Sequence, residues 1–186
     1  FLKRAVVGGI ERVFEINRNF RNEGSDSTHS PEFAMLEFYE AYADYRDMAR
    51  TTRELIQEAA VAATGSTVVR HFDGTELDLS GEWAEISLYE ATSAAVGVEL
   101  TPETSVADLR ALCDEAGIDY APGWIAGKLL EEIFEHYVIP TFTGPTFVMD
   151  YPLDTSPLLL TDKPGSFSFY TLSGVSRDST GATLGG

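Results

Sequence analysis

The sequence predicts an α+β fold in which antiparallel strands are flanked by helices. Two runs, residues 14–23 and 33–42, alternate with a period of two, as β-strands do, and a polar loop separates them. Two further runs, residues 45–60 and 127–137, repeat apolar side chains at intervals of three and four residues, as amphipathic helices do. We expect the two strands and their loop to form the hairpin around which the rest of the chain is organised.

The chain has the length and composition of one globular domain. Its 186 residues are enough for a sizeable core, and 44% of them are hydrophobic and 11% aromatic. The single cysteine, Cys113, excludes an internal disulfide and lies in an apolar helical segment, so we expect a buried structural thiol. The sequence has no cationic leader and no uninterrupted apolar run of about 18 residues, and it therefore predicts a cytoplasmic protein without a membrane span.

The net charge of −17 is unevenly distributed along the chain. Residues 1–53 hold 8 Lys and Arg against 9 Asp and Glu, whereas residues 54–186 hold 5 against 21. Nucleic-acid binding requires cations that face phosphates, so the second part is a poor RNA surface. Any RNA contact is expected near the amino-terminal part, and no DNA partner is predicted.

Capping and turn signals place the other elements. Gly8 and Gly9 end a short helix at the start of the sequence. The helix after the second strand begins at Asp44 or Asp47 and continues to Gly65. The later elements are a hairpin at 67–80, helices at 87–96, 104–116 and 127–137, and strands at 146–151 and 167–175.

These elements predict one catalytic-type domain over residues 1–175 with an insertion. Residues 66–122 are acidic, rich in loops and without recognisable chemistry, and we expect them to form a hairpin and helices packed on the sheet. Residues 176–186 match no pattern and are predicted to be a disordered tail.

Pairing of the two strands would gather polar side chains on one face of the hairpin. These are Arg21, Glu23, Glu37 and Tyr39, set among Phe33 and Met35. A carboxylate among apolar neighbours is costly to bury unless it meets a cation or a donor, so Glu37 either forms a structural ion pair with Arg21 or serves a ligand. The loop at 24–31 brings His29 and four hydroxyls over that face, which favours a charged, polar ligand.

The same residues resemble a known family. FRNEG, a short loop and then HSPEF-x-MLE-x-Y resemble motif 2 of the class II aminoacyl-tRNA synthetases. The continuation HSPEFAMLEFYEAYADY is similar to the lysyl-tRNA synthetase family in particular, since the aspartyl and asparaginyl relatives close the loop with a different sequence. The resemblance runs from residue 1 and continues, more loosely, to residue 158. It implies the class II catalytic fold, an antiparallel sheet flanked by helices.

The resemblance also implies an activity. Enzymes of this family join lysine to ATP as lysyl-adenylate, pass the lysyl group to tRNA, use Mg²⁺ and form homodimers. Arg21 matches the motif 2 arginine, which is catalytic and bridges the lysine carboxylate and the α-phosphate. Glu23 matches the acid that faces the nucleotide, His29 the loop residue near the distal phosphates, and Phe33 the aromatic side chain against adenine.

Glu37 and Tyr39 match the pair that receives the lysine side-chain ammonium. This match has an independent rationale, because a carboxylate and a phenol on an apolar floor select a terminal cation.

The chain also departs from the family pattern. It lacks a third, glycine-rich motif that ends in arginine, and Ser176 stands where the family has its first magnesium-binding acid. No metal-binding residues are therefore predicted. We expect a partial catalytic domain, incomplete at both ends, that is inactive or weakly active alone.

Two alternatives remain open at this stage. The chain could be a non-catalytic remnant that binds nucleotide or lysine, or it could serve lysyl transfer to a protein or lipid acceptor instead of tRNA.

Overall fold

The computed structural model describes residues 1–22, 30–71, 74–155 and 171–173. In this part of the chain the strands form three small sheets. Two are antiparallel pairs, and in the third β6 is central, parallel to β5 and antiparallel to β7. The strands are β1 (Arg12–Phe20) with β2 (Glu32–Glu40), β3 (Val68–Arg70) with β4 (Glu76–Asp78), and β5 (Ala84–Ser87), β6 (Thr146–Met149) and β7 (Thr171–Ser173).

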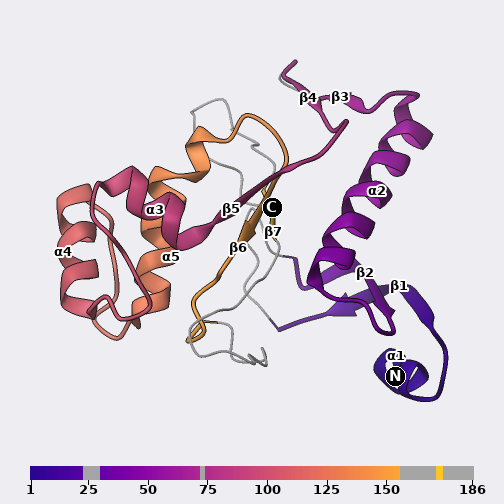
Figure 1. The fold of residues 1–186 in the computed structure, drawn as a ribbon, viewed down its shortest axis with the longest axis horizontal. Coiled ribbons are helices and arrows are strands. Elements are labelled where there is room, and N and C mark those ends of the chain that lie inside the picture. The colour runs from indigo at the N-terminus through magenta and orange to yellow at the C-terminus, as the bar shows by residue number, and fades with distance from the viewer. Residues whose placement is uncertain (23–29, 72–73, 156–170, 174–186) are drawn as a thin grey trace.

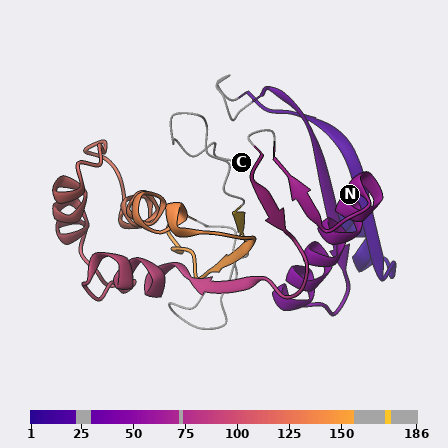
Figure 2. The same cartoon turned by 90° about the horizontal axis from the view of Figure 1, so that it is seen from above.

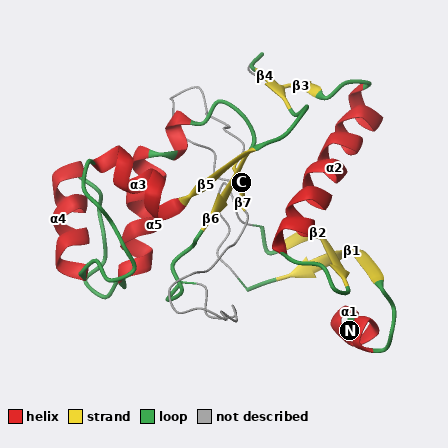
Figure 3. Cartoon of the chain, in the orientation of Figure 1, coloured by secondary structure: helices red, strands yellow, loops and turns green. Residues whose placement is uncertain are grey.

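The helices lie at the two ends of the molecule. They are α1 (Leu2–Val7), α2 (Tyr45–Thr64), α3 (Leu88–Val96), α4 (Val106–Ala116), α5 (Ala126–Tyr137) and the short 3₁₀ helix η1 (Ile139–Thr141). Figure 1 shows the β1–β2 hairpin with α1 and α2 at one end, α3, α4 and α5 at the other, and the β5–β6–β7 sheet between them. Figure 2 shows the same division from above, and Figure 3 distinguishes helices from strands.

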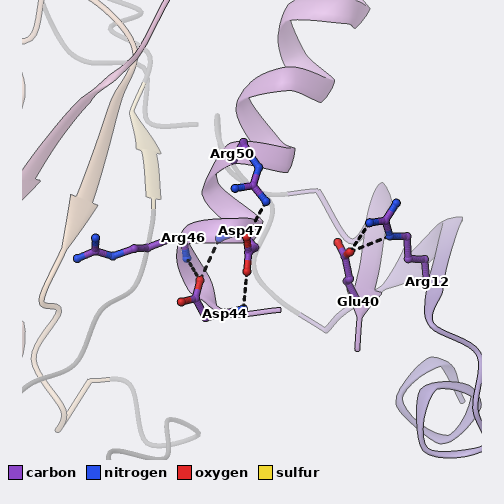
Figure 4. A network of polar contacts seen from close by, with 6 residues as sticks. All are labelled: Arg12, Glu40, Asp44, Arg46, Asp47 and Arg50. Carbon is purple, nitrogen blue, oxygen red and sulfur yellow. Dashed lines mark hydrogen bonds and ion pairs between the residues drawn. The ribbon is translucent and has the colours of Figure 1, made fainter. Parts of the chain in front are cut away.

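Helix α2 begins and ends where the sequence predicts. The side chain of Asp44 accepts hydrogen bonds from the backbone N–H groups of Arg46 and Asp47, at 2.8 and 3.1 Å, and the Asp47 carboxylate accepts from the Asp44 N–H (Figure 4). Gly65 ends the helix in the left-handed conformation, with a φ of 79°. This reciprocal cap fixes the direction in which the chain leaves the hairpin.

The main core lies among α3, α4, α5 and β6. Its largest fully buried members come from all four elements and are Leu88, Thr92, Cys113, Leu129, Leu130, Ile133 and Val148. Cys113 has no exposed surface and forms no disulfide, which confirms the predicted buried thiol. The four elements therefore form one packed unit.

A second, smaller core joins α2 to the central sheet. Ala49 and Ala60 of α2 pack with Leu79, Trp83 and Phe147. The Trp83 and Phe147 ring centroids are 5.3 Å apart, and the indole N–H donates to the Leu79 carbonyl at 2.9 Å.

Two polar contacts support this junction. Gln57 of α2 donates from Nε2 to the carbonyls of Leu79 and Gly81, at 2.6 and 2.9 Å, and Arg53 forms an ion pair with Glu82. The hairpin is thus attached to the rest of the fold through α2.

The α+β class is supported, but the sheet arrangement differs from the expectation. The strand expected at 14–23 starts two residues earlier and ends at Phe20. The strand expected at 33–42 starts one residue earlier and ends at Glu40. β5 was not predicted, and its parallel pairing with β6 departs from a wholly antiparallel sheet. The strand expected to reach residue 151 ends at Met149, because Asp150 takes a φ of 59°, outside the extended region.

None of the described helices combines the length and the apolar composition that crossing a membrane requires.

Candidate functional site: one face of the β1–β2 hairpin

The strand register decides which side chains share a face. Residues directly opposite each other in an antiparallel pair point to the same side, and this side changes with every residue. One face of the hairpin, called the polar face here, carries Val13, Glu15, Asn17 and Asn19 from β1 and Phe33, Met35, Glu37 and Tyr39 from β2. This confirms that Phe33, Met35, Glu37 and Tyr39 share one face.

Arg21 lies just beyond the end of β1 but continues the hairpin. Its backbone N–H donates to the Pro31 carbonyl at 3.0 Å, which extends the pairing by one more step and places Arg21 on the polar face. The Arg21 guanidinium carbon is 5.3 Å from the centroid of the Phe33 ring. At the loop end of the face, a planar cation and an aromatic surface therefore lie side by side.

The other end of the polar face holds the Glu37–Tyr39 pair. The Tyr39 hydroxyl donates to Glu37 Oε1 at 3.4 Å, and both side chains are half-buried. Burial raises the pKa of Tyr39, and the Glu37 charge and the hydrogen bond to it raise it further, so the phenol is protonated at neutral pH.

A lysine of the chain itself lies beside this pair. The Lys3 ammonium nitrogen of α1 is 5.7 Å from the centroid of the Tyr39 ring, and α1 packs against both β1 and β2. Lys3 was not singled out from the sequence, because nothing in the pattern of residues 1–7 brings it to the hairpin.

The register separates Arg21 from Glu37. Glu37 stands opposite Glu15, which is six residues before Arg21 in β1. At roughly 3.3 Å per residue, this is a distance of about 20 Å along the strand. A direct Arg21–Glu37 ion pair, the structural alternative that the sequence allows, does not fit this spacing.

Two predicted site residues cannot be placed. Glu23 and His29 lie outside the described residues, so their positions relative to Arg21 and Phe33 stay predictions.

Glu15 is a candidate that sequence reasoning missed. It lies on the polar face directly opposite Glu37. The period-two pattern that places Arg21 on this face also places Glu15 there, but only the register reveals its partner across the hairpin.

The opposite face of the hairpin is apolar, with charges at its margins. Phe14 and Ile16 are 69% and 71% exposed. Arg12 pairs with Glu40 at 2.6 Å near one end (Figure 4), and Arg18 pairs with Glu32 at 2.6 Å near the other. The charges described on this face are therefore paired with each other, unlike those of Glu15 and Glu37.

The sequence of this chain matches a known protein family over most of its length. Residues 1–172 match the family described as class II tRNA synthetases (D, K and N). Because the match covers most of the chain, the protein belongs to that family.

Individual proteins similar to this chain are mostly lysine–tRNA ligases among those found. The chain is 55% identical over 160 residues to a lysine–tRNA ligase of Kineococcus radiotolerans and 54% identical over 160 residues to one of Mycolicibacterium gilvum. These matches cover 86% and 85% of the chain, and the chain spans 32% of the length of each relative. It is also 50% identical over 162 residues to the lysylphosphatidylglycerol biosynthesis bifunctional protein LysX of Nocardia farcinica, covering 85% of the chain and 14% of that protein.

Proposed function

We propose that this chain carries the lysine- and ATP-binding hairpin of an enzyme that activates lysine as lysyl-adenylate and transfers the lysyl group to tRNA. The observation that carries the proposal is the placement of Arg21 and Glu37 at opposite ends of one face. The lysine–tRNA ligases among the relatives support the choice of lysine.

The separation of the two charges suits this amino acid. Lysine carries a carboxylate at one end and an ammonium at the other, and it is extended when both are bound. Glu37 would take the ammonium and Arg21 the carboxylate. Since the two residues are about 20 Å apart along the strand, an extended ligand and two side chains reaching toward it are needed to join them.

Selectivity would come from Glu37 and Tyr39. The ammonium has three N–H donors, and a half-buried carboxylate is a full countercharge for it. The protonated Tyr39 hydroxyl holds Glu37 in place by its hydrogen bond. A neutral isostere would leave the carboxylate without a cation, which is the strongest means a site has to reject an analogue.

Catalysis of adenylate formation would rest on Arg21. The lysine carboxylate oxygen forms a bond to the α-phosphorus of ATP, while the bond from that phosphorus to the bridging oxygen breaks and pyrophosphate leaves. Negative charge builds between two anions, and a guanidinium can donate to both at once. Phe33, beside Arg21, offers a flat apolar surface for the adenine ring.

ATP and Mg²⁺ belong to the proposal as substrate and expected ion, with Glu23 and His29 as further nucleotide contacts. The described residues include no group of three or more His, Cys, Asp or Glu side chains that could hold a metal ion. No step is therefore assigned to the ion. A cytoplasmic homodimer with tRNA as its nucleic-acid partner completes the proposed setting.

Calorimetric titration of the 186-residue chain tests the proposal. Lysine should bind more tightly than norleucine, which has the same carbon chain and α-amino group but no side-chain ammonium, and ATP should bind independently of either. Equal affinity for lysine and norleucine, or no binding of lysine, would refute it.

A second acceptor is supported by one relative. The similarity to LysX of Nocardia farcinica, a protein of lysylphosphatidylglycerol biosynthesis by its name, favours phosphatidylglycerol as a second lysyl acceptor. Both functions would use the same hairpin to form lysyl-adenylate, so they differ only in the acceptor. Supplying the full-length protein with tRNA and with phosphatidylglycerol, and identifying which one becomes lysylated, separates them.

A further inference from the structure

Glu15 and Glu37 stand directly opposite each other on the polar face. Side chains in this relation have their Cβ atoms about 4.5–5.5 Å apart, and like charges placed so are destabilising. The hairpin therefore holds two carboxylates where one strand pair would normally place an opposite-charge or apolar pair.

Neither carboxylate is neutralised within the described part of the chain. Glu15 Oε1 accepts from Asn17 Nδ2 at 2.9 Å, and Glu37 Oε1 accepts from the Tyr39 hydroxyl at 3.4 Å. Both donors are neutral. The carboxylates at the margins of the opposite face, Glu32 and Glu40, are by contrast each paired with an arginine.

An ammonium of the chain itself lies near the Tyr39 ring. Lys3 Nζ lies 5.7 Å from the centroid of the Tyr39 ring, although Lys3 is exposed and belongs to a different element. The Tyr39 ring at this end of the polar face therefore has an ammonium within cation–π range.

We infer that Glu15 is a second specificity-determining acid of the lysine end, and that it shares the ligand ammonium with Glu37. The inference rests on the proposed function and extends it from one carboxylate to two. The narrow gap across the strands accommodates a compact ammonium, whose three N–H groups can reach both carboxylates. The wide, planar guanidinium of arginine fits it less well.

The charges of the site support this sharing. The two carboxylates carry two negative charges, and neither forms an ion pair within the described residues. A bound ammonium would therefore offset part of their mutual repulsion. A metal ion is a weaker candidate, because the described residues form no group of three or more potential metal ligands.

Glu15→Gln tests the inference in the 186-residue chain by calorimetric titration with lysine, arginine, norleucine and ATP. The substitution keeps the shape and the acceptor for Asn17 but removes the charge. Lysine affinity should fall at least tenfold, and the affinities for norleucine and ATP should stay within twofold. The preference for lysine over arginine should shrink.

Glu32→Gln is the matched control, because it removes a carboxylate from the same hairpin on the opposite face. It should leave lysine affinity within twofold. The double variant Glu15→Gln/Glu37→Gln should lose less lysine affinity than the product of the two single losses, because both residues act on one ammonium.

The same titrations distinguish failure of the inference about Glu15 from failure of the proposed function. If Glu37→Gln weakens lysine binding but Glu15→Gln does not, the inference is overturned and the proposed function stands. If Glu15→Gln lowers the melting temperature and weakens every ligand alike, Glu15 is a fold residue and the inference is overturned. If the unsubstituted chain does not bind lysine, the proposed function and the inference are both overturned.

Discussion

Arg21 and Glu37 lie on the same face of the β1–β2 hairpin, separated by six residues of strand, which is about 20 Å. This spacing is too wide for an ion pair between them and suits an extended ligand with opposite charges at its ends. Arg21 and Glu37 are therefore the two residues that we propose to hold the two ends of the ligand.

Arg21→Ala should lower the rate of lysine-dependent ATP–pyrophosphate exchange by about 10²–10³-fold, because a preorganised cation at the reacting phosphate is lost. The dissociation constant of lysine should change less than threefold. The rate is measured with this segment placed in a full-length lysine–tRNA ligase. Arg18→Ala, which removes an arginine from the opposite face, is the control and should leave the rate nearly unchanged. If the two substitutions lowered the exchange rate equally, Arg21 would have no specific role in the reaction.

Gly127→Ala should destabilise the fold by about 1–3 kcal/mol, the usual cost of overpacking. An added Cβ would lie 2.6 Å from Pro152 Cβ and closer still to Asp154 Oδ1, while the Gly127 N–H donates to Asp154 Oδ2 at 3.0 Å. Urea denaturation measures the change. Gly123→Ala is the matched control, because among the described residues no atom beyond its own chain neighbours lies within 4 Å of its added Cβ. A Gly127→Ala chain as stable as this control would contradict the close approach.

Asp44→Ala should cost about 1 kcal/mol of unfolding free energy, because it removes the side-chain cap of α2. Ser87→Ala, at the start of α3, is a useful comparison, since the Ser87 side chain makes no capping hydrogen bond. It should change the unfolding free energy by much less. Similar losses at the two positions would show that the hydrogen bonds of Asp44 contribute nothing specific.

Cys113 should resist modification in the native protein. Burial raises the pKa of its thiol, with smaller contributions from Asp114 and Glu132, so less thiolate is present at any pH than for a free cysteine. The raised pKa also makes the free energy of unfolding depend on pH. Above the ordinary thiol pKa, Cys113 loses its proton in the unfolded chain first, so this residue favours unfolding as the pH rises. Reaction with a thiol-specific disulfide reagent at pH 8 should be slow in buffer and fast in urea. Fast reaction in buffer would show that the core around α4 opens readily.

Much of the hairpin could be predicted from the sequence. Period-two alternation alone assigns Phe33, Glu37 and Tyr39 to one face, and it does not depend on where the strands begin. The predicted strand ends were displaced by one to three residues, because hydrogen-bonded pairing, and not polarity, decides where a strand stops.

Other features could not be predicted from the sequence, because they depend on how the elements pair and pack. Strand β5 has four residues and leads directly into α3, so it leaves too short a pattern to recognise. The position of Glu15 opposite Glu37 depends on register, which the sequence of either strand does not contain. The contact of Lys3 with Tyr39 depends on how α1 packs on the hairpin.

The binding of lysine and ATP to Glu37→Gln, measured beside the unsubstituted chain, tests the central claim most directly. The substitution keeps the size of Glu37 and an acceptor for Tyr39 but removes the countercharge of the ammonium. Lysine binding should weaken by about 2–4 kcal/mol, the range for breaking a hydrogen-bonded charge pair, and ATP binding should barely change. Equal weakening of lysine and ATP would contradict the account, because Glu37 would then support the fold and not the ligand.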